Sequence, residues 1–260
     1  VICKSTPTRS RRLIPGLRGS PGIDNGGACG GVAVRSRGVV RPAMTRRVVV
    51  MAGGPGKRLG DLTQHTPKPL LQVGTKPILE TILDTFVEQG FTDFTFSVNY
   101  RAEMIMEHFG DGKRWGVAID YVREQRPLGT AGSLALFRDR PDTPLVVMNG
   151  DLLTKIDFRK LLDFHQSNGH TATMTVREHE IAIPYGVVDI RAQRITELVE
   201  KPVKRYFINA GIYVLEPSCI DYIPPDSFCD MTDLYARLLE QGYPLGAFPI
   251  HEYWQDIGQV

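Results

Sequence analysis

From Val48 onward, short apolar runs alternate with segments in which apolar residues recur every three to four positions. The runs predict buried strands, and the recurring spacing predicts amphipathic helices. We expect strands at 48–51, 94–98, 117–122 and 145–149. We expect a helix that begins at Thr75 (with Thr75 as cap and Pro77 in the first turn) and ends at Gly90, and helices at 102–109, 130–137 and 157–168. This alternation predicts an α/β fold with a mostly parallel sheet covered by helices on both faces.

After a helix that ends near residue 168, the pattern changes to strands separated by short turns. We expect these later strands at 171–176, 185–190, 194–200 and 210–215, followed by a helix from about 230 to 241 and strands at 245–250 and 253–257. Strands joined by short turns run antiparallel, because a parallel connection needs a longer crossover. Part of the sheet is therefore expected to be antiparallel.

The charge is divided unevenly along the chain. Of 31 Lys and Arg and 29 Asp and Glu, residues 1–47 hold ten of the basic residues and a single acid, Asp24. A basic protein would indicate nucleic acid or an anionic membrane as partner, but this charge lies in a segment with eight Gly, four Pro and no periodicity. We predict a disordered basic extension over 1–46 and one domain over 47–260, with no nucleic acid and no membrane as partner.

The remaining composition indicates a cytoplasmic protein. The Arg/Ser-rich start has the composition of an organellar transit peptide but lacks an amphipathic apolar face. No run of 18 apolar residues indicates a membrane span. The four cysteines have no CxxC spacing and no His at metal-ligand spacing, so we expect free thiols in a reducing compartment.

A glycine-rich loop, AGGPGKRL (52–59), follows the first strand. It is not a Walker loop, because Met51 stands at the first glycine position and Arg58 at the Ser/Thr position. It is not a dinucleotide fingerprint either, since Leu59 replaces the third glycine. What remains is a loop whose small residues let backbone N–H groups approach an anion, or else a tight turn with solvated basic residues.

Basic residues accompany the loop and favour the anion-binding interpretation. Arg58 can bridge two phosphate oxygens with its planar fork, and Lys68 adds a compact positive charge. This pair suits a triphosphate better than a nicotinamide dinucleotide.

The loop, followed by PKPLLQVGTKPILE (67–80), resembles the signature A-G-G-x-G-T-R-L…P-K-P-x-L-x-V of sugar-1-phosphate nucleotidylyltransferases. The likeness continues in family order through PLGTAGSL, VVMNGD, PYGVV, EKP, NAGIYVL and YWQDIG, and it covers residues 48–258. The resemblance implies a Rossmann-like three-layer α/β/α nucleotidyltransferase fold. FINAGIYVLEP and PIHEYWQDIG look most like the branch that acts on mannose, heptose or glucosamine 1-phosphate.

In that family an oxygen of the sugar 1-phosphate attacks the α-phosphorus of an NTP and pyrophosphate leaves. By this resemblance, Arg58 and Lys68 would be the catalytic residues. The residues expected to bind the nucleotide are Ala52, Gly53, Gly54, Gly56, Lys57, Glu124, Gly129 and Thr130. Lys57 departs from the Thr or Ser usual in relatives, and the chain stops two residues after Gly258, where relatives continue with more helix, which leaves the completeness of the fold open.

Glu124 occupies a position where thymidylyl and uridylyl members of the family commonly carry Gln. A carboxylate there can accept from both N1–H and the N2 amine of guanine, whereas thymine suits an amide better. This favours GTP as the substrate. Gln125 is the next residue, and a shift of one position would restore a preference for UTP or dTTP.

Two carboxylates are candidates for a Mg²⁺ site. Asp151 follows the apolar run VVMN and is expected at the carboxyl end of a strand, where open α/β sheets bind ligands. Asp256, in WQDIG, is the second. Mg²⁺ takes one or two protein carboxylates together with phosphate oxygens and waters, so two aspartates suffice. Without the resemblance, Asp151 could equally be a helix cap or a turn former.

The resemblance also implies a sugar-phosphate site. Its expected members are Tyr185, Gly186, Glu200, Lys201, Asn209 and Gly211. Glu200 would hold sugar hydroxyls and Lys201 the sugar phosphate. Asn209 has an independent argument, because a polar residue that opens an apolar strand must find hydrogen-bond partners.

The sequence therefore predicts a cytoplasmic, Mg²⁺-dependent enzyme that makes an NDP-sugar for polysaccharide biosynthesis from an NTP, GTP before UTP or dTTP, and a sugar 1-phosphate. A homo-oligomer stays open. One alternative is a non-catalytic regulatory subunit of the same fold, although such subunits are expected to lose their charged site residues. A glycosyltransferase would need a DxD metal motif, and residues 149–151 are Asn-Gly-Asp.

Overall fold

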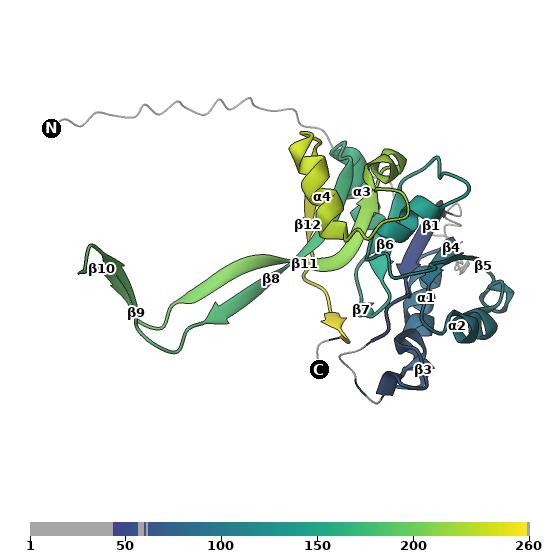
Figure 1. Cartoon of the computed structure of the whole chain (residues 1–260), viewed down its shortest axis with the longest axis horizontal. Helices are drawn as coiled ribbons and strands as arrows, with labels where there is room; N and C mark the ends of the chain where they lie inside the picture. Colours follow the sequence, from purple (N-terminus) through teal and green to yellow (C-terminus); the bar gives the residue numbers. More distant parts are fainter. Residues whose placement is uncertain (1–43, 57–59, 61, 259–260) are drawn as a thin grey trace, which may run out of the picture. The chain divides into compact units, whose positions relative to one another are not determined.

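The central sheet of the computed structural model has seven strands among the described residues, which are 44–56, 60 and 62–258. They are β1 (Met44–Met51), β4 (Phe91–Val98), β5 (Ala118–Arg123), β6 (Leu145–Asn149), β8 (Ala172–Ala182), β11 (Val203–Leu215) and β12 (Leu245–Pro249). Their order is β12-β8-β11-β6-β1-β4-β5 (Figure 1). β1 pairs in parallel with β4 and β6, β4 with β5, and β8 with β12, whereas β11 is antiparallel to both its neighbours. The mixed, mostly parallel sheet is confirmed.

Helices cover both faces of this sheet. They are α1 (Ile78–Glu88), α2 (Ala102–Phe109), α3 (Phe158–Ser167) and α4 (Met231–Glu240), with 3-10 turns η2 (Lys68–Leu70), η3 (Lys113–Trp115), η4 (Gly132–Leu136) and η5 (Pro217–Tyr222). Successive residues of β1 point to opposite faces: Val48 and Val50 pack with α1, α2 and α3, while Val49 packs with α4. This gives the expected three layers. None of these helices has the length and apolar character that a membrane span needs.

The predicted start of the first helix is wrong, because the observed N-cap lies two residues later than the predicted one. Thr75 does not cap it, because Lys76 and Pro77 form the short strand β3 (Lys76–Pro77), which pairs with β2 (Gln72–Val73). Pro77 has an extended ψ of 149° and becomes the N-cap, so α1 begins at Ile78. Because the backbone of Lys76 and Pro77 pairs with β2, these residues cannot form the first turn of the helix.

β8 and β11 continue beyond the central sheet as a two-stranded ribbon (Figure 1). The hairpin of β9 (Val187–Arg191) and β10 (Arg194–Val199) follows at its end. Most large apolar side chains of the ribbon and hairpin are exposed, among them Ile190, Leu198 and Phe207. The predicted strands at 171–176 and 210–215 cover only the buried parts of β8 and β11, because the exposed parts carry no burial pattern.

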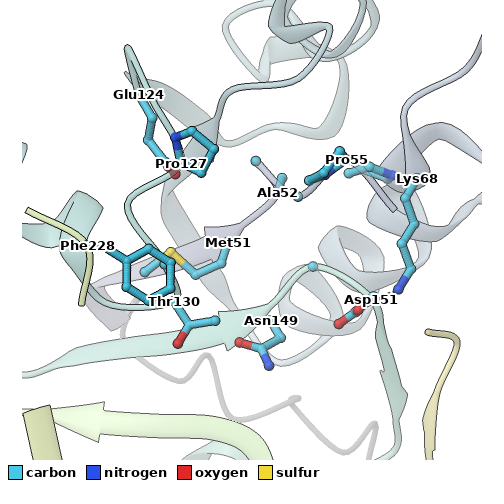
Figure 2. Close-up of a pocket in the computed structure, with 15 residues that line it drawn as sticks. Met51, Ala52, Pro55, Lys68, Glu124, Pro127, Thr130, Asn149, Asp151 and Phe228 are labelled. Carbon is cyan, nitrogen blue, oxygen red and sulfur yellow. Dashed lines mark hydrogen bonds and ion pairs between the residues drawn. The ribbon is translucent and has the colours of Figure 1, made fainter. Parts of the chain in front are cut away.

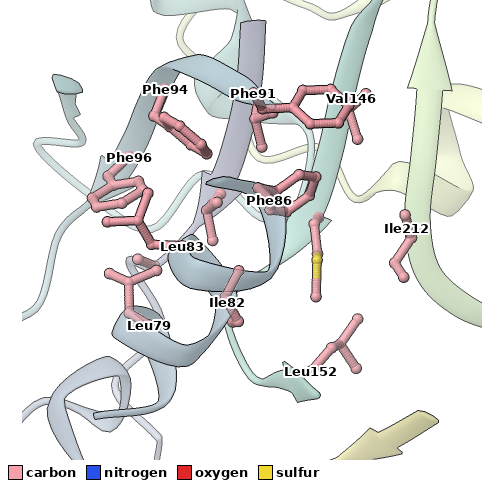
Figure 3. Packing of buried hydrophobic residues seen from close by; sticks show 14 of the residues in the cluster. Leu79, Ile82, Leu83, Phe86, Phe91, Phe94, Phe96, Val146, Leu152 and Ile212 are labelled. Atoms are coloured by element: carbon pink, nitrogen blue, oxygen red, sulfur yellow. The ribbon is translucent and has the colours of Figure 1, made fainter. Parts of the chain in front are cut away.

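Phe86 of α1 lies at the centre of the aromatic core (Figure 3). Its ring stacks on Phe158 with centroids 3.9 Å apart and meets the edges of Phe91 and Phe94. We expect Phe86→Ala to lower the free energy of unfolding by roughly 3–5 kcal/mol, because it leaves a cavity among rings that cannot collapse. Urea unfolding measures this. The control Phe207→Ala, at a side chain 68% exposed, should change it by less than about 0.5 kcal/mol. Equal effects of the two changes would contradict the assignment of the core.

Candidate active site

A pocket of about 260 Å³ opens where β1 and β6 end (Figure 2). These strands are parallel neighbours, so their carboxyl ends meet at one edge of the sheet, where open α/β folds bind ligands. The lining residues are Met51, Ala52, Gly53, Gly54, Pro55, Lys68, Pro69, Glu124, Pro127, Gly129, Thr130, Asn149, Gly150, Asp151 and Phe228. This edge of the sheet holds most of the residues that the sequence predicts to bind the nucleotide.

The glycine-rich loop forms one wall of the pocket. Ala52, Gly53 and Gly54 line it, as predicted for a loop that approaches a phosphate. Gly56 does not line it but turns the chain, with a φ of +64° and no room for a side chain, since a Cβ there would lie 2.8 Å from Thr63 Cγ2. The predictions for Lys57 and Arg58 lie outside the described residues and stay predictions.

Glu124 closes one end of the pocket and is nearly buried, with 8% of its surface exposed. Ser97 Oγ donates to Glu124 Oε1 over 2.7 Å, and the Leu128 backbone N–H donates to Oε2 over 3.0 Å. Each carboxylate oxygen can accept a further hydrogen bond, so Glu124 can both hold its loop and receive a ligand donor. Gln125 lines a different hollow, so of the two candidates only Glu124 is placed at this pocket.

Gly129 and Thr130 line the same end and are fixed by the start of α4. The Thr130 N–H and Oγ1 donate to Asp230 Oδ1 over 3.0 and 3.3 Å, and Thr130 Oγ1 accepts from the Met231 N–H. A Cβ on Gly129 would lie 2.6 Å from the Cys229 carbonyl oxygen. These contacts fix the backbone of Gly129 and Thr130 along the pocket.

Lys68 and Asp151 line the opposite end of the pocket, and Asp256 lies beside them. Lys68 is 8% exposed, and its Nζ donates to Asp151 Oδ2 over 2.5 Å. Asp256 reaches the same place because β13 (Trp254–Asp256) pairs with β7 (Leu152–Thr154), and the Ile257 N–H donates to the Asp151 carbonyl oxygen. A Cβ on Gly258 would lie 2.7 Å from Lys68 Nζ, 2.9 Å from Asp256 Oδ1 and 3.2 Å from Asp151 Oδ2. The three groups thus surround one point.

Asp151 and Asp256 bring two carboxylates close together around Gly258. Carboxylate oxygens are ligands that Mg²⁺ takes together with phosphate oxygens and waters, so the metal role of these two residues stays a prediction. No third His, Cys, Asp or Glu joins them within the part of the chain that the structure describes. Such an open set suits an ion that is held partly by its substrate.

Four of the predicted sugar-site residues form a separate group. Tyr185, Gly186, Glu200 and Lys201 lie where the ribbon meets the β9–β10 hairpin (Figure 1). They contact one another, since the Lys201 N–H donates to the Tyr185 carbonyl oxygen, but they do not line the pocket, and Tyr185 is 74% exposed. Their role in binding a sugar phosphate stays a prediction.

Asn209 and Gly211 lie nearer the sheet, at a register shift in β11. Asn209 has the hydrogen-bond partners that its position required: its Nδ2 donates to Tyr213 Oη over 2.7 Å, and its Oδ1 accepts from the Gly211 N–H. Burial raises the pKa of Tyr213 to about 12, so its hydroxyl stays protonated. A Cβ on Gly211, whose φ is +73°, would lie 2.8 Å from Asn149 Nδ2. Neither residue lines the pocket, so their predicted sugar contacts stay untested.

Sequence reasoning did not assign seven of the lining residues to the site, and two of these, Asn149 and Phe228, have side chains that bear on ligand binding. Asn149 lies between the two ends, and its Oδ1 is buried without a hydrogen-bond partner among the described residues. A buried acceptor without a partner is costly unless a ligand supplies a donor. The signal was available, since Asn149 is a polar residue that closes an apolar strand. Phe228 carried no such signal.

The fold and this edge of the sheet are those of an α/β protein with a pocket of glycine and charged residues, and the chain belongs to the nucleotidyl transferase family, whose model matches residues 47–260. Among relatives, mannose-1-phosphate guanyltransferase of Schizosaccharomyces pombe is 35% identical over 222 residues, which cover 82% of this chain and 61% of that protein. The enzyme of the same name from Pichia angusta is 36% identical over 81% of this chain and 60% of its own length. The chain thus spans about three fifths of these relatives.

Solved structures share the fold. HddC from Yersinia pseudotuberculosis in complex with GMP-PN has a TM-score of 0.62 and 26% identity, and the match covers 82% of this chain and 94% of that one. A Bacillus anthracis protein assigned as a glucose-1-phosphate thymidylyltransferase has a TM-score of 0.66 at 24% identity, over 82% of this chain and 90% of that one. The expected Rossmann-like nucleotidyltransferase fold is confirmed.

Proposed function

We propose that this chain transfers a nucleoside monophosphate from an NTP, preferably GTP, to a sugar 1-phosphate, forming an NDP-sugar and pyrophosphate. The observation that carries the proposal is that Lys68 and Asp151, with Asp256 beside them, lie at one end of a pocket whose other end is lined by Glu124 and Thr130. In this proposal the base lies at the end lined by Glu124 and Thr130, and the phosphates lie at the end lined by Lys68 and Asp151.

The reaction brings two negatively charged phosphates together. An oxygen of the sugar 1-phosphate forms a bond to the α-phosphorus, and the bond from that phosphorus to the bridging oxygen of the pyrophosphate breaks. Lys68 supplies a positive charge that is nearly buried, where its effect on developing charge is greatest. Asp151 and Asp256 would hold Mg²⁺, which when bound offsets the phosphate charges. No covalent nucleophile is required.

Several observations support GTP as the nucleotide. Glu124 presents carboxylate oxygens at the base end, which match the two donors on the guanine edge. The relatives named above are guanyltransferases, and the HddC structure contains GMP-PN, a guanine nucleotide analogue. Mannose 1-phosphate is accordingly the first acceptor to test. The cytoplasmic location and a homo-oligomer remain further proposals.

Pyrophosphate release across a matrix of NTPs and sugar 1-phosphates tests the proposal. We expect turnover with GTP and at least one hexose or heptose 1-phosphate, and much less with UTP or dTTP. Nucleotide binding without turnover on any acceptor would instead support a non-catalytic regulatory subunit. That alternative does not account for the retention of Lys68, Asp151 and Asp256 around one point.

Glu124→Gln should shift the nucleotide preference from GTP toward UTP or dTTP. The amide can still accept from Leu128 and donate to Ser97, so the loop is expected to stay in place, but one guanine donor loses its charged acceptor. Losing charge-assisted hydrogen bonds of roughly 1.5–3 kcal/mol should reduce the GTP/UTP ratio of kcat/KM about ten- to a hundredfold. Direct competition between GTP and UTP, with the products separated by chromatography, measures this ratio.

Gln125→Glu is the matched control, because Gln125 lines a different hollow. It should leave the ratio unchanged. A wild-type preference for UTP or dTTP, or a larger effect at Gln125, would refute the assignment of Glu124 to the base.

A further inference from the structure

Phe228 has a large aromatic side chain that is exposed to solvent at the pocket. Its exposed fraction is 62%, and it lines the pocket together with Pro127 and Thr130. Figure 2 shows it at the end formed by Thr130, Pro127 and Glu124, away from Lys68 and Asp151. It belongs to neither hydrophobic core cluster, and no ring contact within the described part of the chain involves it. Its position is therefore not explained by packing of the protein itself.

The backbone next to Phe228 is hydrogen-bonded to the loop that carries Gly129 and Thr130. The Cys229 N–H donates to the Leu128 carbonyl oxygen over 2.9 Å, and the Cys229 carbonyl accepts from the N–H groups of Ala131 and Gly132 over 2.9 and 3.0 Å. Gly132 permits this approach, since a Cβ there would lie 2.7 Å from the Ser227 carbonyl oxygen. The segment that carries Phe228 and the loop that carries Thr130 thus form one hydrogen-bonded unit.

An exposed aromatic ring on a backbone held by hydrogen bonds, at the proposed base end of the pocket, can contact a bound nucleotide. Every nucleobase presents a flat face, so an aromatic side chain can stack on it whatever hydrogen-bonding groups the base carries at its edge. The edge of the base is read by polar groups, for which Glu124 is the candidate here. The residue that contacts the face of the base would then supply affinity, and a different residue, at its edge, would supply selectivity.

We infer that Phe228 stacks on the base of the bound nucleotide and supplies affinity that does not depend on which base is present. The inference rests on the proposed function, because it requires the pocket to bind a nucleotide with its base at the Thr130 end. It differs from the role of Glu124 in one measurable way: loss of Phe228 weakens all nucleotides alike, whereas loss of the Glu124 charge changes their order.

Calorimetric titration without a sugar acceptor tests the inference, with GTP, ATP and inorganic triphosphate as probes. We expect Phe228→Ala to raise the Kd of GTP and of ATP by the same factor, roughly tenfold or more. The Kd of triphosphate, which has no base, should not change. Phe228→Trp should restore GTP binding, and Phe228→Leu, which keeps bulk without a flat face, should restore it only in part. Phe207→Ala, at a Phe that is 68% exposed on β11, is the matched control and should change nothing.

The outcomes distinguish failure of the proposed function from failure of the stacking role of Phe228. If wild-type protein binds triphosphate but gains no affinity from a base, or binds no nucleotide, the proposed function fails. If GTP binds and Phe228→Ala binds it equally well, stacking alone is overturned. If Phe228→Ala weakens triphosphate as much as GTP, Phe228 acts through the fold and stacking is also overturned; circular dichroism of each variant identifies a general loss of structure.

Discussion

We expect Asp151→Asn and Asp256→Asn each to remove nearly all turnover while the chain stays folded. The two carboxylates surround one point beside Lys68, and an amide there removes a negative oxygen ligand without changing the shape of the side chain. Because a bound divalent cation contributes several kcal/mol of charge stabilisation, we expect kcat/KM to fall at least about a hundred- to a thousandfold. Pyrophosphate release under saturating GTP and Mg²⁺ measures the loss, and circular dichroism confirms the fold.

Asp221→Asn is the matched control for these two changes. Asp221 is exposed and forms an ion pair with Arg140 on the surface, so its loss should leave turnover unchanged. Raising the concentration of Mg²⁺ or replacing it with Mn²⁺ should recover part of the activity of the Asn variants. Full activity in either variant, or activity that survives EDTA, would contradict the two-carboxylate site.

We expect Lys68→Met to reduce turnover by a comparable factor for a different reason. Lys68 is 8% exposed and lies 2.5 Å from Asp151, so its charge acts where water does not screen it. Methionine has a similar length and no charge, so the packing is retained while the countercharge to the phosphates is lost. We expect kcat/KM to fall roughly a hundred- to a thousandfold, as for removal of one preorganised electrostatic group.

Lys76→Met provides the comparison for Lys68. The Lys76 side chain is 48% exposed and pairs with Asp84 on α1, so kcat/KM should stay the same. Separating kcat from KM adds a second check, since a group that acts on charge developing during the reaction lowers kcat, whereas one that only binds substrate raises KM. A Lys68→Met variant within twofold of wild type, with kcat unchanged, would remove Lys68 from the reaction.

The sequence predicted the layered fold well because a helix or strand with one buried face has apolar residues at a regular spacing. The helix at 102–109 and the strand at 145–149 have the predicted limits, since each has apolar residues at the spacing that its buried face demands. The strands of the ribbon were predicted too short because their outer halves are exposed and need no such spacing. The start of α1 was displaced by the pairing of Lys76 and Pro77 with β2, which depends on a turn geometry and not on apolar spacing.

For the site, the sequence by itself determined the chemical groups, and the tertiary structure decided which of them meet. The motifs identified Lys68, Asp151 and Asp256, but their convergence required β13 to pair with β7 across about a hundred residues of chain. The choice of Glu124 over Gln125 followed from which side chain the turn after β5 directs into the pocket. Phe228 was found only in the structure, because an apolar residue in a sequence predicts burial, and its exposure at the pocket arises from hydrogen bonds between two distant segments of backbone.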